Sequence, residues 1–307
     1  MSTVTHIPGG ETQAPAPIVT RRRSKAPYLL LLPGVVWLLI FFALPMLFLA
    51  SQSLQTGSLE QGYQLTWHFG TYVDAISTFH SQMIRSFVYA GTATALGLLI
   101  GYPLAYAIAF KSGRWKNILL VMVIAPFFTS FLIRTLAWQT ILSSNGPVVG
   151  FFRWTHLMNL LRALHFVVGN DLLSTPFAVV MGLTYNFLPF MVLPLYASLE
   201  RIDIRLLEAG GDLYARPFTA FRKVTWPLSL PGVVAGTLLT FIPAAGDYIN
   251  SKLLGSTSTT MIGQVIDGQF LRVLDYPTAA ALSFTLMLSI LVLVAVYVHR
   301  AGTEELV

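Results

Sequence analysis

Long apolar segments without charged residues constrain this chain more than any other feature of its sequence. A helix needs about 20 predominantly apolar residues to cross the hydrocarbon core of a bilayer. Five segments of about that length contain no charged residue, and a sixth contains only Arg134. The predicted spans are about 28–50, 86–110, 118–142, 175–199, 228–246 and 277–298. The pattern predicts an all-α integral membrane protein with six transmembrane helices.

The low charge content excludes a soluble protein of this length. Charged residues make up 10% of the 307 residues, whereas a soluble domain carries about 25%. Cysteine is absent, which excludes disulfides, thiolate metal sites and cysteine nucleophiles. The histidines are too far apart in sequence for two of them to share a helical turn, so we expect no metal site.

The start of the chain divides into a tail and an anchor. Residues 1–27 form a basic tail, and we predict disorder in its proline-containing beginning. The run Arg21-Arg22-Arg23 resembles the start of a signal peptide, but a cleaved signal has an apolar region of only about 7–15 residues. The apolar segment here is longer, so we expect it to remain as a span. A six-helix membrane domain then covers 28–300, and a short tail covers 301–307.

The distribution of basic residues predicts the orientation. Loops 111–117 and 200–227, together with both termini, carry thirteen Lys and Arg residues, against five on the opposite side. Lys and Arg accumulate in the cytoplasmic loops of membrane proteins, so we expect both termini in the cytoplasm. The net charge of +6 then reflects topology and contact with anionic lipid, and we expect no nucleic-acid partner.

Two spans contain small residues at every fourth position, which predicts close helix packing. These are Ala93, Gly97, Gly101 and Ala105 in one span and Gly232 and Gly236 in another. Arg134 lies near the outer end of its span, so we expect its side chain to reach the membrane surface. Segment 151–164 is predicted as one short interfacial helix, and 51–85 and 247–276 as mixed polar and aromatic loops.

The most informative loop is 200–227. Asp203 is a suitable N-cap, and apolar residues follow at helical spacing at 206, 209 and 213, on one face with Ile202. Pro217 can begin a second short helix as its first residue. We predict two amphipathic helices at nearly right angles. The residues alone leave an alternative open, which is an ordinary basic loop lying on lipid.

Several segments resemble one family of membrane proteins. Glu208-Ala-Gly, followed by Val224-Thr-Trp-Pro, is similar to the EAA loop of the permease subunits of ABC importers. Segments 125–138, 185–196, 241–248 and 261–264 resemble the spermidine/putrescine, or polyamine, branch of that family. The similarity covers roughly residues 28–300. It implies the six-helix MetI-like fold of a type I importer permease, in the inner membrane of a bacterium.

The resemblance also implies the working partners. It implies two ATP-binding subunits, a second related permease, an extracytoplasmic polyamine-binding protein and a polyamine substrate. No Gly-x-x-x-x-Gly-Lys-Ser/Thr segment occurs, so ATP and Mg would be bound by the partner ATPase subunits and not by this chain, which would be no enzyme itself. The residues that the resemblance assigns to ATPase coupling are Leu206, Glu208, Ala209, Gly210, Gly211, Asp212, Leu213 and Pro217.

The loop departs from the family pattern at two positions. Residue 210 is glycine where the family has alanine, and residue 214 is tyrosine where a family glycine turns the chain. A bulky residue in a left-handed conformation is costly. We therefore expect Tyr214 to have a negative φ and the elbow to lie at Gly210-Gly211.

A path for a flexible polycation needs acidic groups and aromatic faces. Ionisable residues in membrane spans are costly and usually functional, and Asp247 lies at the outer end of the fifth predicted span. Aromatic rings nearby could offer cation–π contacts. The path candidates are Trp138, Tyr185, Asn186, Phe190, Asp247 and Tyr248.

Other function classes stay open at this point. A secondary carrier or channel for small cations would need coupling-ion ligands in its spans, where only Arg134 and Asp247 carry charge. A membrane enzyme would need an acid–His pair, a Ser/His set or metal-ligand spacing, and no span shows one. An ABC permease for another solute, such as a metal chelate, also fits. The choice between spermidine and putrescine, and between a pair of identical and of different permeases, stays open as well.

Overall fold

The computed structural model describes residues 26–58, 60–163, 172–212, 214 and 216–301. The predicted disorder in the N-terminal tail and the C-terminal tail from residue 302 fall outside these residues. The chain divides into two compact units, Met1–Phe48 and Leu49–Val307. In the first unit, α1 (Ala26–Leu38) and η1 (Leu39–Ala43) lead into α2 (Leu44–Ser53). From Leu30 to Ser53 they form one apolar helix long enough to cross a membrane.

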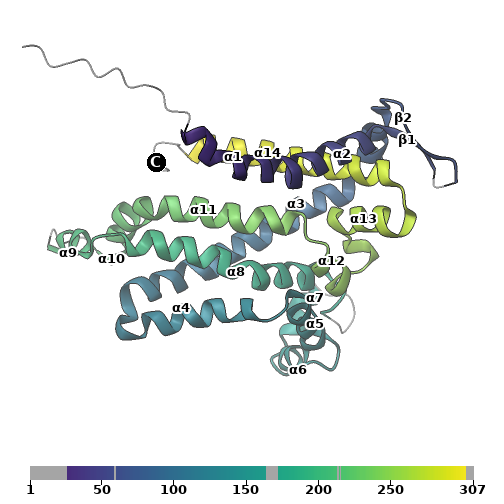
Figure 1. Ribbon diagram of the computed structural model, residues 1–307. Helices are drawn as coiled ribbons and strands as arrows, with labels where there is room; N and C mark the ends of the chain where they lie inside the picture. Colours follow the sequence, from purple (N-terminus) through teal and green to yellow (C-terminus); the bar gives the residue numbers. More distant parts are fainter. Residues whose placement is uncertain (1–25, 59, 164–171, 213, 215, 302–307) are drawn as a thin grey trace, which may run out of the picture. The chain divides into compact units, whose positions relative to one another are not determined.

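Three long helices form the centre of the second unit (Figure 1): α3 (Gly70–Tyr106), α8 (Pro176–Glu200) and α11 (Trp226–Ala245). Each of them packs against the other two, and α14 (Tyr276–Ala301) packs mainly against α3. At one end, α3 continues into the π-helical segment η2 (Ala107–Lys111), and α11 is preceded by the π-helical segment η5 (Phe221–Thr225).

Small residues allow the three central helices to approach closely. A Cβ added at Gly101 of α3 would lie 3.2 Å from the Met191 side chain of α8. A Cβ at Gly236 of α11 would lie 3.0 Å from the carbonyl oxygen of the same Met191. Ala93 and Ala105, in the same stripe as Gly101, are fully buried. The predicted close packing is confirmed.

The third predicted span is not a single straight helix. It begins with η3 (Gly113–Trp115), α4 (Lys116–Ile124) and η4 (Ala125–Phe128) and resumes at α5 (Phe131–Leu142). Thr129 and Ser130 between them have extended backbone angles, and the two halves meet at 94°. Five helices of the described residues are therefore long and apolar enough to span a membrane, and the bent pair makes a sixth if it counts as one span.

Several segments predicted as loops contain regular structure. In 51–85, β1 (Gln55–Ser58) and β2 (Gly62–Leu65) form an antiparallel hairpin, and α3 begins well before the predicted span. Segment 247–276 holds α12 (Ile249–Leu254), η6 (Thr257–Thr259), α13 (Ile262–Gly268) and η7 (Gln269–Val273). The single interfacial helix predicted at 151–164 is instead two helices, α6 (Pro147–Trp154) and α7 (Leu157–Ala163), because His156 between them is left-handed at φ 57°.

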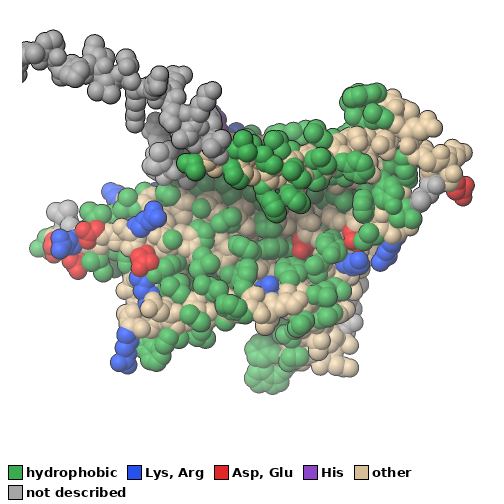
Figure 2. Space-filling view, viewed as in Figure 1, with side chains coloured by type: hydrophobic (Ala, Val, Ile, Leu, Met, Phe, Trp, Pro, Cys, Tyr) green, Lys and Arg blue, Asp and Glu red, His purple; other side chains and the backbone are tan. Residues whose placement is uncertain are grey.

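The second unit has two different ends (Figure 1). α9 (Ile204–Asp212) and α10 (Pro217–Ala220) lie at one end, while α5, α6, α7 and α12 lie at the other. Figure 2 shows that Lys, Arg, Asp and Glu gather mainly toward these two ends, with hydrophobic side chains over the helices between them. We call them the α9 end and the α12 end.

Candidate functional site

The segment at the α9 end has the first of the two short helices that the sequence predicts, but the second is not separate, because α10 continues through η5 into α11 as one helix over Pro217–Ala245. Asp203 precedes α9, and its Oδ1 accepts a hydrogen bond of 3.0 Å from the backbone N–H of Arg205. This is the predicted N-cap, which satisfies one of the free donors at the start of the helix. Pro217 is the first residue of α10, also as predicted. We call residues 203–218 the elbow segment.

The turn between the two helices contradicts the prediction made for it. Tyr214 has φ 58°, in the left-handed region, and α9 runs through Gly210 and Gly211 as far as Asp212. The elbow therefore lies at Tyr214, where the family has glycine, and not at Gly210-Gly211. The prediction failed because it assumed that the side chain would prevent the left-handed conformation. The Tyr214 side chain is 97% exposed, so no neighbouring group opposes this conformation, and only the local contact of its Cβ with the backbone makes it costly.

The elbow segment presents apolar side chains outward. Ile204, Leu206 and Phe218 are each about half exposed or more, and the carboxylates Glu208 and Asp212 are exposed as well. Ile202, predicted to share the face of Leu206, is instead buried in the helix bundle. The side chains of Ala209, Gly210, Gly211 and Leu213 lie outside the described part of the structure.

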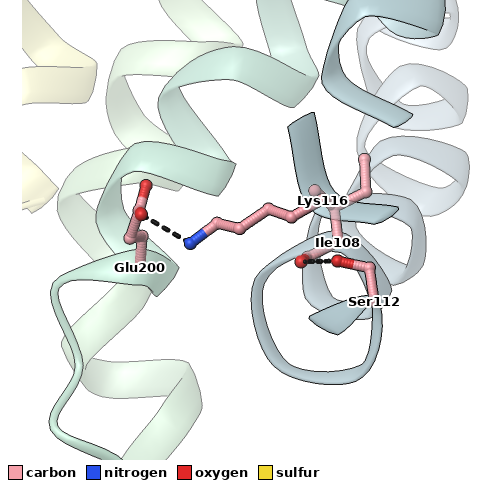
Figure 3. A network of polar contacts seen from close by, with 4 residues as sticks. All are labelled: Ile108, Ser112, Lys116 and Glu200. Carbon is pink, nitrogen blue, oxygen red and sulfur yellow. Dashed lines mark hydrogen bonds and ion pairs between the residues drawn. The ribbon is translucent and has the colours of Figure 1, made fainter. Parts of the chain in front are cut away.

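An ion pair joins α4 to the end of α8, three residues before the elbow segment (Figure 3). Lys116 at the beginning of α4 pairs with Glu200 at the end of α8, and its Nζ lies 5.3 Å from the centre of the Tyr196 ring. Just before α4, the Ser112 hydroxyl donates a hydrogen bond to the carbonyl oxygen of Ile108. Both members of the ion pair are partly exposed, so the pair contributes at most about 1 kcal/mol. It nevertheless fixes which residues of α4 and α8 lie side by side.

The α12 end contains a buried hydrogen-bonded network that joins three helices. The Nδ2 of Asn186 on α8 lies 3.0 Å from the Oδ1 of Asn250 on α12 and 3.3 Å from the Oγ1 of Thr135 on α5. The backbone N–H of Asn250 donates to the Oδ1 of Asp247 at 2.7 Å. Burial raises the pKa of the Asp247 carboxyl to about 6. We call these four residues the polar network.

Glycine 182 allows the network to form. A Cβ at this position on α8 would lie 2.7 Å from the Oδ1 of Asn250, so only glycine lets α12 come this close. On the other side of α12, Ser251 donates to the Oε1 of Gln264 on α13 at 2.7 Å. The short helices of the α12 end are thus held by side-chain hydrogen bonds as well as by apolar packing.

Comparison with known proteins shows the family. Residues 93–303 match the family described as the binding-protein-dependent transport system inner membrane component. The chain belongs to this family. It is 34% identical over 278 residues to the spermidine/putrescine transport system permease protein PotB of Salmonella typhimurium (strain SL1344), covering 90% of this chain and 94% of the relative. It is 34% identical over 264 residues to the protein of that name from Escherichia coli (strain K12), covering 86% and 93%.

A solved structure supports the fold. The permease resembles a chain of a bacterial alginate ABC transporter, solved in complex with an alginate pentasaccharide-bound periplasmic protein. The TM-score is 0.63 at 20% identity, over 90% of this chain and 93% of that one. The predicted all-α importer-permease fold and the resemblance to the polyamine branch are therefore confirmed. The chain is a transport component and a multi-pass inner-membrane protein.

The Arg134 side chain of the permease is buried among its neighbours, whereas we expected it to extend to the surface. Its side chain is only 8% exposed, and its Cζ lies 5.4 Å and 5.5 Å from the ring centres of Phe127 and Phe131. Its Nε and Nη1 find no hydrogen-bond partner among the described residues. The expectation was wrong because the break at Thr129 and Ser130 turns α5, so that Arg134 lies within the bundle and not near the end of a straight helix.

The predicted path residues separate into small groups. Trp138 on α5 and Tyr185 on α8 are in edge-to-face contact, with ring centres 5.6 Å apart. Phe190 makes a similar contact of 5.0 Å with Phe127. The ring of Tyr248 lies 5.6 Å from the Nζ of Lys252 on α12. Asn186 and Asp247 belong to the polar network.

Sequence reasoning missed two members of this network, Thr135 and Asn250. Each was hard to recognise by itself, because threonine is common in membrane helices and Asn250 lies in a segment predicted as a loop. The available signal was Asn186, an amide in the middle of an apolar span. Such a group needs a hydrogen-bond partner on a neighbouring helix, and a search for partners would have directed attention to Thr135 and Asn250.

Proposed function

We propose that this permease forms part of the translocation path of an ATP-driven importer of polyamines, the substrate class named in its relatives. Two separate ATP-binding subunits hold ATP and Mg, and a second, related permease and an extracytoplasmic polyamine-binding protein complete the complex. The sequence supports a separate ATPase, because it lacks a phosphate-binding Gly-x-x-x-x-Gly-Lys-Ser/Thr segment.

The elbow segment is the docking site for the ATPase in this proposal. One observation carries it: Leu206, Tyr214 and Phe218 are 49%, 97% and 73% exposed on one short helical segment. An amphipathic helix that presents apolar side chains in this way fits a hydrophobic groove on a partner. Glu208 and Asp212 would make polar contacts at the rim of that groove. Docking of the ATPase requires the α9 end to face the cytoplasm, the side on which the distribution of Lys and Arg in the sequence predicts both termini.

The α12 end then belongs to the outer part of the path. Tyr248 lines a cavity of about 360 Å³ together with Asp267 and Phe270, and Asp247 lies directly before Tyr248. Carboxylates attract the ammonium groups of a polyamine, and each aromatic face adds about 0.5–2 kcal/mol through cation–π contact. Trp138 and Tyr185 offer further ring surface, while Asn186 and Phe190 hold the helices that carry these groups.

The proposal is tested by uptake into proteoliposomes that contain the complete complex. Labelled spermidine or putrescine should enter only with ATP, the ATPase subunits and the binding protein present. Unlabelled spermidine, putrescine and unrelated cations or metal chelates added as competitors identify the substrate. Uptake by the isolated permease, driven by an ion gradient without any ATPase, would instead support a secondary carrier.

A further inference from the structure

Five aromatic residues connect the elbow segment to α3. Phe221, the first residue of η5, contacts Tyr102 and Tyr106 of α3 edge to face. The ring centres are 5.7 Å apart for Tyr102 and 6.3 Å apart for Tyr106. Its ring centre also lies 6.5 Å from that of Phe218 on α10 and 6.4 Å from that of Trp226 at the start of α11. Phe221 therefore touches every other ring in the group. We call these five residues the aromatic joint.

A hydrogen bond fixes one side of the joint. The Tyr102 hydroxyl lies 2.8 Å from the hydroxyl of Ser229 on α11, and both residues are buried. Ser229 in turn donates to the carbonyl oxygen of Trp226 at 3.0 Å. The pair ties α3 to α11 one turn beyond the Trp226 ring, so the rings cannot slide past one another without breaking a buried hydrogen bond.

The backbone on both sides of the joint departs from regular α-helix. Phe221 begins the π-helical segment η5, and η2 directly follows Tyr106 on α3. Phe110 within η2 also contacts Tyr106, at 4.9 Å. Single π-helical turns are rare and often occur at functional sites, because they change the register of the residues that follow. The joint thus lies where both helices depart from regular α-helical hydrogen bonding.

We propose that the aromatic joint transmits movement of the elbow segment to α3, with Phe221 and Tyr102 as its positioning residues. Phe218 is exposed on the docking surface at one side of Phe221, and Tyr102 is buried in the helix bundle at the other. A displacement of α10 by the ATPase moves Phe221 and pushes on α3 directly, in addition to pulling on α11 through the chain. This inference rests on the proposed docking of the ATPase to the elbow segment.

The test measures the number of ATP molecules hydrolysed per polyamine imported in the reconstituted complex. Phe221→Leu keeps an apolar side chain but removes the ring contacts, and we expect hydrolysis to continue while uptake falls about tenfold. Tyr102→Phe keeps every ring and removes only the hydroxyl, so it folds and should raise the ratio about two- to threefold. Phe87→Leu is the matched control, because Phe87 stacks on Phe241 between the same helices α3 and α11 at 6.2 Å, away from the joint.

The outcomes separate the two proposals. A raised ratio in Phe221→Leu and Tyr102→Phe, with Phe87→Leu within twofold of the wild type, supports the joint. A parallel fall of uptake and hydrolysis, or an unchanged ratio in both joint variants, overturns it while the docking of the elbow segment stands. If Leu206→Asp leaves uptake and hydrolysis at the wild-type level, the docking proposal fails, and the joint fails with it.

Discussion

The two ends of the second unit use their polar and apolar residues in opposite ways. At the α9 end, apolar side chains such as Leu206 and Phe218 are exposed and charged side chains surround them. At the α12 end, polar side chains such as Asn186 and Asn250 are buried and bind one another. The exposed apolar side chains of the α9 end can contribute free energy to binding a partner, whereas the buried polar side chains of the α12 end bind one another, with Asn186 Oδ1 and Asn250 Nδ2 lacking a partner among the described residues.

This difference predicts two classes of variant. A substitution at the α9 end should change association and transport but hardly change the stability of the permease, because exposed side chains contribute little to it. A substitution in the polar network should change stability, because it leaves a buried polar group without a partner. A side chain of the polar network that also belongs to the translocation path should change transport as well as stability when it is substituted.

The largest expected effect is on transport at the α9 end. Leu206→Asp places a charge on the docking surface, where burying it against a partner is costly. We expect uptake by the complex to fall about a hundredfold, equivalent to about 2.7 kcal/mol, with unchanged thermal stability of the purified permease. Leu65→Asp is the control, because Leu65 in β2 is 49% exposed, as Leu206 is. Equal losses in the two variants would contradict a specific docking role.

A smaller effect is expected on stability at the α12 end. Asn250→Leu keeps the number of side-chain heavy atoms but removes the 3.0 Å acceptor of the Asn186 amide, which keeps only the Thr135 hydroxyl at 3.3 Å. We expect the free energy of unfolding in detergent to fall by about 2 kcal/mol. The control is Asn159→Leu, since Asn159 is exposed on α7. If the two variants are equally stable, the network does not hold the α12 end together.

The sequence could predict most of the bundle but not these two ends in full. Long apolar runs and small-residue spacing are local signals, and they located the helices and the Gly101 and Gly236 contacts. The break before α5 was less visible, because Pro126 is one of many prolines in the spans and the extended residues Thr129 and Ser130 carry no strong signal. The burial of Arg134 follows from that break, so the two errors share one cause.

Asp247 tests whether one member of the network also serves the path. Burial raises its pKa to about 6, so it holds its proton to a higher pH than an ordinary aspartate and is ionised only above that value. If its charge attracts the polyamine, wild-type uptake should fall as the pH decreases through about 6. Asp247→Asn retains an Oδ1 acceptor for the N–H of Asn250 and should lower uptake about tenfold at neutral pH.

The measurement is the amount of polyamine imported per ATP hydrolysed, recorded as a function of pH. The Asp247→Asn variant should lack the decline near pH 6 that the wild type shows. Asp74→Asn, which removes an exposed carboxylate from α3, should retain it. A variant at 247 with wild-type uptake at every pH would remove Asp247 from the path and leave it a structural role only.

Tyr214 shows why the elbow could not be predicted from residue preferences. The left-handed conformation costs a non-glycine residue roughly 1–2 kcal/mol, and this argument placed the turn at Gly210-Gly211. The structure keeps those residues helical and accepts the cost at Tyr214. Local backbone strain often persists at functional positions, so the tyrosine ring on the docking surface gives a physical reason for the substitution.

The smallest effect separates the strain at this position from the ring. Tyr214→Gly should raise the free energy of unfolding by about 1 kcal/mol, because glycine adopts a positive φ without a steric cost. Tyr214→Ala keeps the Cβ and the strain but removes the ring, so its stability should stay near that of the wild type. If the ring contacts the ATPase, both variants should lower uptake by a similar factor, about fivefold for a lost contact of 1 kcal/mol. If uptake is unchanged in both, the ring takes no part in docking, and the exposed apolar side chains of the two helices alone form the surface.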